Sequence, residues 1–382
     1  MRRKWRSLRQ MFDAAGQRNG RQRVLFFSHG RQDWPHLWPL ATALAEDCSA
    51  QILYVCATAD DPANSTSCKF IHPILLDSPL LCAAYLGTVE VDVCVSTLPD
   101  LGTSFWKRSA RIARYVYVPH SLVSCHMIYR TGAFDQFDEA FCAGAHHVME
   151  LRALEAHRKQ PPKYLFEYGY PKLDSLLAAS VFSPPKEAPT ILLAPSWGSP
   201  GLLEMHGKRI IKDMLSSGYR VVVRPHPETM KRSASVLGDL RNQFAANPGV
   251  AFDLASESAQ SFAEADLMIS DWSGAALEFA LGLKRPVIFV DIPRKVNNPD
   301  YVALGIEPVE VWARTRMGLV VGASELDVLV DQVRVLLDRS KSNWDHALES
   351  LRQELVFNPT DAARLGAARL NEMLRSLEVE KA

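Results

Sequence analysis

The sequence lacks any hydrophobic run long enough to cross a membrane as a helix. A spanning helix needs about 18 or more consecutive apolar residues, and no stretch of the 382-residue chain reaches that length. The N-terminus is basic, but it has no apolar core of the kind found in secretory signal peptides. We therefore expect neither a membrane-spanning helix nor a secretory leader.

Several signatures of cofactor and metal sites are also missing. No Gly-x-Gly-x-x-Gly motif follows the first predicted strand, which argues against a nicotinamide cofactor. The 11 histidines include no His-Glu-x-x-His or His-x-x-Glu-His spacing, and no Asp-x-Asp cluster is visible. The sequence therefore predicts no cofactor and no metal site.

Cysteine is scarce and unevenly distributed. All seven cysteines lie within the first 142 residues, and no two of them form a Cys-x-x-Cys pair. Cys56 and Cys94 stand inside apolar runs, where a thiol behaves as a small hydrophobic group. This pattern favours the reducing environment of the cytoplasm over a disulfide-bonded secreted fold.

The chain as a whole has no excess of charge of one sign, but its first 23 residues do. The 43 basic and 43 acidic residues cancel. Residues 1–23 contain eight basic residues and one acidic residue, a net charge of +7, whereas the remaining residues contain 35 basic and 42 acidic ones, a net charge of −7. The overall balance argues against a chain coated with nucleic acid.

Residues 1–12 allow two interpretations. Trp5, Leu8, Met11 and Phe12 recur at helical spacing among several arginines, which suits a short helix lying on an anionic membrane surface. The alternative is a solvated tail. Nucleic-acid binding is less favoured, because no further cluster of basic and aromatic residues follows. On the first interpretation the protein is cytoplasmic and peripheral at the inner face of the cell membrane.

Short apolar runs alternate with helix-like segments along the chain. In the first half, the predicted strands are 24–28, 51–56, 91–96, 115–119 and 139–143, and the predicted helices are 37–46, 79–86 and 106–113. In the second half, the predicted strands are 190–194, 219–224, 250–253, 266–270, 286–291 and 318–321, and the predicted helices are 202–216, 231–246, 275–283 and 325–339. This alternation is typical of parallel sheets covered by helices.

A proline-rich stretch divides the two halves. Residues 182–189 contain three prolines, which continue neither a helix nor a central strand. The predicted organisation is α/β: a basic segment (1–22), a Rossmann-like acceptor domain (23–181), a linker (182–189), a Rossmann-like donor domain (190–357) and a C-terminal helix (358–382), capped by Thr360. Two such doubly wound domains are expected to face each other across a cleft, with ligands at the carboxyl ends of the strands.

Arg224-Pro-His226-Pro follows one predicted strand of the donor domain. The two prolines fix the backbone, so the cation and the imidazole project from a rigid turn. A guanidinium can bind two phosphate oxygens, and an imidazole can donate a hydrogen bond to a phosphate or move a proton. The alternative is a rigid turn with an incidental histidine. We favour Arg224 and His226 as phosphate-contacting residues.

Another motif, Ser270-Asp271-Trp272-Ser273-Gly274, leads from a strand into a helix. Free backbone N–H groups at such a helix start attract anions, although plain capping by Ser273 would satisfy the same sequence. Glu278 lies about one turn further along this helix. It is either an acceptor for ribose or glycerol hydroxyls or a surface charge.

Three further loops carry candidate residues at strand ends. Ser196 lies in a loop of small residues after the strand at 190–194, and this loop lacks the lysine of a nucleotide-binding P-loop. His120, followed by Ser121, is the candidate general base, because an imidazole titrates near neutral pH. His29 is a second histidine at a strand end. His29 and Ser121 are candidates for the acceptor side, and each histidine has the alternative of a loop-packing residue.

Five motifs in order resemble those of the CDP-glycerol glycerophosphotransferase family, the teichoic-acid primases and polymerases. The resemblance covers residues 110–375. This chain differs in having Ser121 where glycine is usual and Trp272 where tyrosine is common, and in lacking an acidic pattern in 292–301. The motifs are Tyr-Val-Pro-His at 117–120, Tyr-Gly-Tyr-Pro-Lys-Leu-Asp at 168–174, Ile-Leu-Leu-Ala-Pro-Ser-Trp at 191–197, Arg-Pro-His-Pro at 224–227 and Ile-Ser-Asp-Trp-Ser-Gly at 269–274.

The resemblance implies a GT-B fold and transfer of glycerol phosphate, or a related polyol phosphate, from a CDP-linked donor. The implied acceptor is a hydroxyl of a lipid-linked or polymeric molecule of the cell envelope. His120 and His226 match the two essential histidines of the family. Ser270, Asp271 and Ser273 match its contacts with the donor phosphates and glycerol. The nucleotide-linked donor is a substrate, so this reaction needs no separate cofactor.

Other functions remain open on the same residues. A nucleotide-sugar glycosyltransferase would use the same helix start for a diphosphate and His120 to deprotonate a sugar hydroxyl. A sugar-nucleotide epimerase is a further possibility, but it would not need the basic N-terminus. A non-catalytic nucleotide-binding protein of envelope assembly is the alternative from another class, although the presence of both histidines argues against it.

Overall fold

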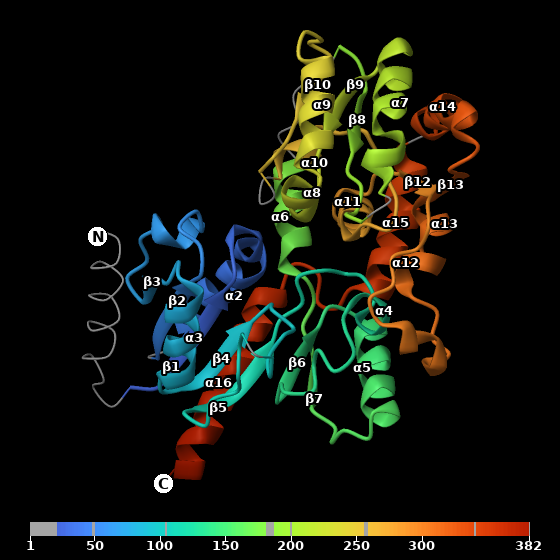
Figure 1. Ribbon diagram of the computed structural model, residues 1–382. Helices are drawn as coiled ribbons and strands as arrows, with labels where there is room; N and C mark the ends of the chain where they lie inside the picture. The colour runs from blue at the N-terminus through green and yellow to red at the C-terminus, as the bar shows by residue number, and fades with distance from the viewer. Residues whose placement is uncertain are drawn as a thin grey trace. The chain divides into compact units, whose positions relative to one another are not determined.

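The computed structural model of the protein (Figure 1) describes residues 21–47, 50–103, 105–180, 187–198, 201–255, 259–339 and 341–381. The basic stretch at 1–12 and most of the predicted linker lie outside the described residues. The chain packs as two compact units. The first unit comprises residues up to His120, residues 129–171 and residues from Val356 onwards, and the second comprises residues 121–128 and 172–355.

The first unit contains a seven-stranded parallel sheet with the strand order β3-β2-β1-β4-β5-β6-β7. Its strands are β1 (Arg23–Ser28), β2 (Gln51–Cys56), β3 (Ile71–Leu75), β4 (Val91–Ser96), β5 (Ile112–Tyr117), β6 (Glu139–Cys142) and β7 (Tyr164–Glu167). Its helices are α2 (Trp34–Asp47), α3 (Pro79–Thr88), α5 (Ala145–His157) and α16 (Ala362–Lys381), with short 3₁₀ turns η1 (Arg31–Asp33) and η2 (Pro62–Asn64).

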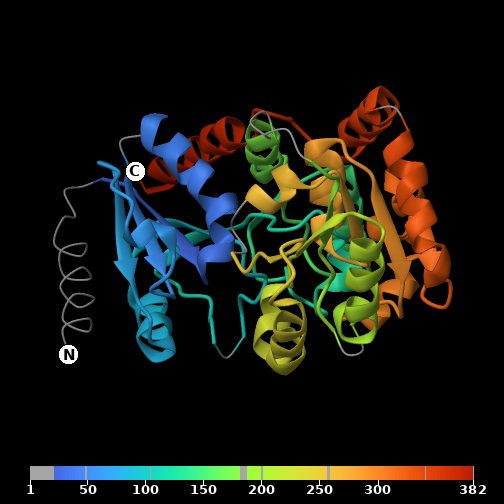
Figure 2. The same cartoon turned by 90° about the horizontal axis from the view of Figure 1, so that it is seen from above.

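The core of the first unit lies on both faces of this sheet. Successive side chains of a strand face opposite sides, so Phe26 joins the cluster formed with α2 and α16, whereas Phe27 packs edge-on against Trp106. The helices α2 and α16 lie side by side (Figures 1 and 2). A Cβ added at Gly366 of α16 would collide with the ring of Tyr168 and lie 2.8 Å from Leu40, so this close approach requires glycine.

The second unit contains a six-stranded parallel sheet with the order β10-β9-β8-β11-β12-β13. Its strands are β8 (Thr190–Leu193), β9 (Arg220–Val223), β10 (Val250–Phe252), β11 (Leu267–Ser270), β12 (Val287–Asp291) and β13 (Gly318–Gly322). Its longer helices are α6 (Pro171–Ser180), α7 (Leu202–Ser216), α9 (Ala234–Phe244), α11 (Gly274–Leu283), α14 (Leu329–Asp338) and α15 (Lys341–Leu355). Its shorter helices are α4 (Cys125–Ile128), α8 (Pro227–Arg232), α10 (Gln260–Glu264), α12 (Val309–Trp312) and α13 (Arg314–Met317), with 3₁₀ turns η3 (Pro299–Leu304) and η4 (Leu326–Val328).

Segments from different parts of the chain complete each unit. The helix α6, which the sequence places in the N-terminal domain, packs in the second unit, where Leu173 and Leu176 lie against Gly282 of α11. The C-terminal helix α16 packs in the first unit. Eight residues, 121–128, leave the first half of the chain to join the second unit.

Two local predictions are wrong. Residues 106–111 form no helix, and Trp106 instead lies in a loop with its indole buried between Phe27 and Phe137, so its apolar character serves packing rather than a helical stripe. Thr360 does not cap α16, because the helix begins at Ala362 and Thr360 itself has a left-handed backbone with φ 70°.

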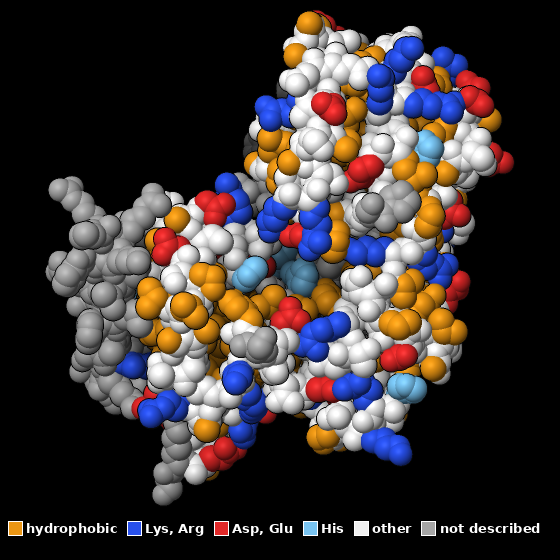
Figure 3. All heavy atoms as spheres, viewed as in Figure 1, with side chains coloured by type: hydrophobic (Ala, Val, Ile, Leu, Met, Phe, Trp, Pro, Cys, Tyr) orange, Lys and Arg blue, Asp and Glu red, His pale blue; other side chains and the backbone are white. Residues whose placement is uncertain are grey.

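Two further expectations concern membrane-spanning helices and the state of the cysteines. In the described part of the chain, no helix is both long and apolar enough to span a bilayer. The six cysteines of this part are free thiols, and all but Cys68 are buried. On the face shown in Figure 3, Lys and Arg side chains are interspersed with Asp and Glu side chains.

Candidate functional site

The strand order of each sheet indicates where a ligand would bind within that unit. In an open parallel sheet, ligands bind at the carboxyl ends of the strands where the order reverses. That point lies between β1 and β4 in the first sheet and between β8 and β11 in the second. The loops that follow these strands and their neighbours contain the predicted histidines, serines and Asp271.

His120 follows β5 in the first unit and is held on both ring nitrogens. Its Nδ1 lies 2.9 Å from the carbonyl oxygen of Thr97, in the loop after β4. A carbonyl only accepts, so Nδ1 carries the proton of the neutral ring and Nε2 is the basic nitrogen. Nε2 lies 3.4 Å from the hydroxyl of Tyr129, and the two rings meet edge-on. The fold therefore fixes the tautomer that a general base requires.

Asp33, which belongs to none of the predicted motifs, is the acidic residue beside His120. It ends η1 after β1, is 5% exposed, and accepts a hydrogen bond of 2.7 Å from the backbone N–H of His29. Burial raises the pKa of Asp33, and the charge of His120 opposes that rise. An ionised Asp33 would in turn stabilise a protonated His120. The ring of His29 is exposed and lies edge-on to Phe105.

In the second unit, Ser270 and Asp271 tie the ends of β8 and β11 together. The hydroxyl of Ser270, fully buried, donates to the carbonyl oxygen of Ala194 at 2.7 Å. The Oδ1 atom of Asp271 accepts a 2.7 Å hydrogen bond from the backbone N–H of Ser196. Burial raises the pKa of Asp271 to about 6. Both side chains thus hold the loop that leads to Trp197.

The start of α11 is capped and closely packed. The hydroxyl of Ser273 accepts a hydrogen bond from the N–H of Ala275, so the predicted cap is confirmed. A Cβ added at Gly274 would lie 2.5 Å from the hydroxyl oxygen of Ser121. Ser121 therefore lies against the first turn of this helix, within the second unit.

Glu278 of α11 is buried and paired. Its Oε2 atom lies 2.7 Å from Nζ of Lys172, the lysine of the Tyr-Gly-Tyr-Pro-Lys-Leu-Asp motif. Glu278 is 5% exposed, so the interpretation of a surface charge is wrong. Lys172 is not among the predicted site residues, although it belongs to one of the five motifs.

The Arg-Pro-His-Pro turn presents its two functional side chains differently. Arg224 is buried, forms a 2.5 Å ion pair with Asp253, donates to Ser261 at 2.9 Å, and stacks on Phe262. His226 caps α8, and its Nδ1 accepts a 3.1 Å hydrogen bond from the N–H of Glu228. In the neutral ring the proton is then on Nε2, which can donate to an anion.

Two tryptophans in this unit lie between cations. Nζ of Lys295 lies 3.1 Å from the centre of the Trp197 ring, and the Arg232 guanidinium lies 5.0 Å from it. The ring of His226 lies 6.2 Å from that of Trp197. Burial lowers the pKa of Lys295 to about 8. These contacts concentrate positive charge beside the loops after β8 and β9.

The second tryptophan, Trp272, is buried under two arginines. Arg314 lies 3.6 Å and Arg294 5.2 Å from the ring centre. Its indole N–H donates to the carbonyl oxygen of Ile292 at 2.9 Å. The cations around both tryptophans come from loops and short helices without a recognisable motif, so no local pattern indicates them.

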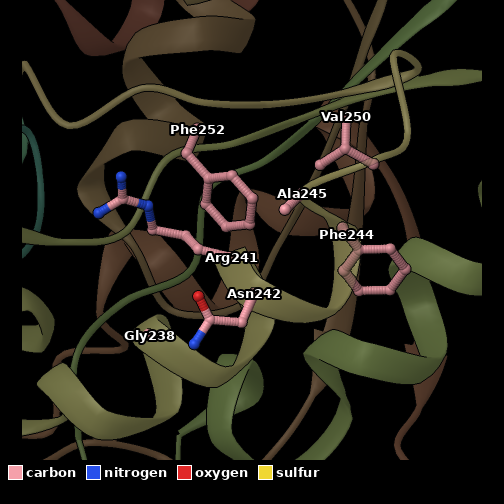
Figure 4. Close-up of a pocket in the computed structure, with 7 residues that line it drawn as sticks. All are labelled: Gly238, Arg241, Asn242, Phe244, Ala245, Val250 and Phe252. Carbon is pink, nitrogen blue, oxygen red and sulfur yellow. The ribbon is translucent and has the colours of Figure 1, made fainter.

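The described part of the chain shows no metal centre, and the pocket in Figure 4 does not include the predicted site residues. The described residues contain no group of three or more His, Cys, Asp or Glu side chains arranged to hold a metal ion. The pocket lies between α9 and β10 (Figure 4), and none of its lining residues is a predicted site residue. They are Gly238, Arg241, Asn242, Phe244, Ala245, Val250 and Phe252.

A family comparison bears on the stretch that holds the donor-side motifs. Residues 145–294 match the model of the CDP-glycerol:poly(glycerophosphate) glycerophosphotransferase family. The predicted resemblance to the glycerophosphotransferases is confirmed. This match to the glycerophosphotransferases includes Arg224, His226 and the start of α11 and indicates a transferase. No curated protein matches the chain.

Solved structures extend the comparison to the whole fold. The structure of the wall teichoic acid polymerase TagF has a TM-score of 0.63 and 12% identity, over 97% of this chain and 98% of that one. A putative UDP-N-acetylglucosamine 2-epimerase from Listeria monocytogenes has a TM-score of 0.58 and 13% identity, over 94% and 97% of the two chains. The UDP-GlcNAc 2-epimerase of Methanocaldococcus jannaschii has a TM-score of 0.55 and 13% identity, over 93% and 100%. The predicted GT-B type of fold is thereby confirmed.

Proposed function

We propose that the protein transfers glycerol phosphate, or a related polyol phosphate, from a CDP-linked donor to a hydroxyl of a lipid-linked or polymeric acceptor of the cell envelope. The observation that carries this proposal is the state of His120: Nδ1 donates to the Thr97 carbonyl, which leaves Nε2 as a base. The family match over residues 145–294 supports a CDP-linked donor.

The proposed reaction begins at the acceptor hydroxyl. Nε2 of His120 takes its proton, and the acceptor oxygen attacks the β-phosphorus of the donor. A new O–P bond forms while the bond from the β-phosphorus to the bridging oxygen breaks, so that CMP leaves with that oxygen. The positive charge gained by His120 is stabilised by Asp33 before the proton passes to solvent.

The donor-side roles follow from the environment of each residue. Nε2 of His226 donates to a donor phosphate, and Ser273, Gly274 and the start of α11 attract the diphosphate. Glu278, paired with Lys172 at 2.7 Å, accepts from hydroxyls of the ribose or the glycerol.

The remaining donor-side residues support this site in the proposal. Arg224 already pairs with Asp253, so we assign it to supporting the turn that holds His226, rather than to direct phosphate contact. Ser270, Asp271 and Ser196 shape the loop after β8.

Two histidine variants and one control test the proposal. Purified protein is assayed with CDP-glycerol and a hydroxyl acceptor for CMP release and for a phosphodiester product. His120→Ala and His226→Ala should each lower kcat by at least about 100-fold, whereas His157→Ala, an exposed residue at the end of α5, should not. Turnover at the wild-type rate in both variants contradicts the assignment.

The same assay separates the alternative functions. Turnover with a nucleotide sugar, yielding a glycosidic bond instead of a phosphodiester, would identify a glycosyltransferase. Nucleotide binding without turnover over a panel of acceptors would identify a non-catalytic protein of envelope assembly.

We also propose that residues 1–12, outside the described part of the chain, bind an anionic membrane surface at the inner face of the cell membrane.

A further inference from the structure

The eight residues 121–128 form a short excursion that begins and ends at the candidate base. The chain passes from the first unit into the second after His120 and returns at Tyr129. These two bracketing residues contact each other in the first unit, with 3.4 Å between Nε2 and the tyrosine hydroxyl. His120 is therefore joined by a single peptide bond to a segment that packs in the other unit.

A buried carboxylate holds the middle of the 121–128 segment. Glu310 of α12 is 2% exposed. Its Oε2 accepts from the backbone N–H of Ser124 at 2.9 Å, and its Oε1 accepts from the Ser124 hydroxyl at 2.7 Å. Ser124 is itself fully buried. The two hydrogen bonds that Ser124 donates to this carboxylate fix both the position and the orientation of Ser124.

The end of the segment is fixed by a second set of bonds. Nδ2 of Asn298 donates to the carbonyl oxygen of His126 at 2.9 Å, and the backbone N–H of Asn298 donates to that of Met127 at 3.1 Å. The imidazole of His126, fully buried, lies with Nε2 3.0 Å from the carbonyl oxygen of Ile306. Asn298 is 2% exposed, so these bonds form in the interior.

The beginning of the segment touches the start of α11. A Cβ at Gly274 would lie 2.5 Å from the Ser121 hydroxyl oxygen, and Ser121 is the residue bonded to His120. Within the second unit, the segment thus runs from Ser121, against the first turn of α11, to its hydrogen bonds with Glu310 and Asn298.

We propose that Glu310 and Asn298 are positioning residues: by anchoring the 121–128 segment in the second unit, they hold the backbone that continues directly from His120. The catalytic part of this inference rests on the proposed function. Since a displacement of about 1 Å can cost about 100-fold in rate, loss of the Glu310 anchor should affect the chemical step more than donor binding.

The test compares Glu310→Ala with Glu310→Gln in the full-length protein. Alanine removes both bonds to Ser124. Glutamine retains an acceptor for the Ser124 N–H, and its amide can donate to the Ser124 hydroxyl, so it is the conservative variant. We expect Glu310→Ala to lower kcat by about 10- to 100-fold, with the Kd for CDP-glycerol unchanged within about twofold, and Glu310→Gln to restore most of the rate.

A second readout is independent of turnover. In protein labelled with ¹³C at the histidine rings, and with the His120 signal assigned through His120→Gln, Glu310→Ala should shift the His120 resonance. The control Leu336→Ala opens a cavity in the core beside α14 of the same unit. It should lower the Tm without shifting that resonance.

The outcomes distinguish the positioning role from the proposed function. If wild-type protein does not turn over CDP-glycerol, the proposed function fails. The His120 resonance alone then tests whether Glu310 has a positioning role. An unshifted His120 resonance in folded Glu310→Ala overturns the positioning role. Equal losses of rate and of donor affinity in that variant also overturn it, because they would indicate general damage to the second unit.

Discussion

Replacing Asp271 with asparagine should change how the stability of the second unit depends on pH. Burial raises the pKa of Asp271 from the ordinary 3.8 to about 6, so the folded state binds this proton more tightly than the unfolded state does. Between these two pH values, the free energy of unfolding falls as pH rises. The rise in pKa corresponds to about 3 kcal/mol, at about 1.4 kcal/mol for each tenfold change in proton affinity.

Asparagine cannot ionise, but its side-chain oxygen can still accept the hydrogen bond from the Ser196 N–H. The free energy of unfolding of wild type minus that of Asp271→Asn should therefore decrease by about 3 kcal/mol as pH rises from about 3 to about 7. Using the difference removes the contributions of other titrating groups, which are common to both proteins.

This difference is measured for the second unit by urea unfolding, monitored through the hydrogen exchange of the amides in β8 and β11. Asp361→Asn is the control, followed through the amides of β1 and β4 because Asp361 lies in the first unit: Arg364 lowers the pKa of Asp361. That stabilisation is present at neutral pH and is lost as pH falls through the lowered pKa, so the Asp361 difference should have the opposite slope. A difference for Asp271→Asn that is flat, or that increases with pH, would show that the pKa of the buried Asp271 carboxyl is not raised.

Three further predictions use other features of the molecule. Lys295, with its pKa lowered to about 8, should lose its charge as pH rises through that value, so CDP binding measured by calorimetry should weaken there in wild type but not in Lys295→Arg; equal weakening in both proteins would exclude Lys295 from donor binding. Gly274→Ala should destabilise the second unit by about 1–3 kcal/mol in urea unfolding through its collision with the Ser121 hydroxyl, and adding Ser121→Ala should restore most of this loss; additive effects would contradict the collision. Deleting residues 1–20 should abolish binding to anionic liposomes in a flotation assay and preserve turnover of a soluble acceptor, whereas undiminished binding would indicate a solvated tail.

The strands buried on both faces were predictable from the sequence. In a parallel sheet covered on both faces, such a strand is a continuous apolar run, and the predicted runs at 51–56 and 91–96 coincide with β2 and β4. The strands β3 and β7 lie at the two edges of the first sheet. Their sequences include Pro73 and exposed Tyr164, so they give no such run, because an edge strand is less constrained.

The candidate site was predictable only where a motif follows a strand. His120, His226 and Ser273 stand directly after strands or at a helix start, and the strand order then determines which edge of the sheet they occupy. Asp33 and Lys295 come from a 3₁₀ turn and a loop, and only tertiary packing brings them to His120 and Trp197. A single sequence contains no local signal for such contacts.

Because α16 belongs to the first unit, the second unit can complete its core before the first, although synthesis of the first unit begins earlier. Its side chains Leu370 and Leu374 belong to the same core as Leu37 and Leu40 of α2, yet the whole second unit is translated between these two helices. The first unit therefore completes its core only after residues 362–381 have left the ribosome. Until then, the apolar face of α2 is exposed to other nascent chains, and a chain halted anywhere in the second unit would be a substrate for chaperones or proteases.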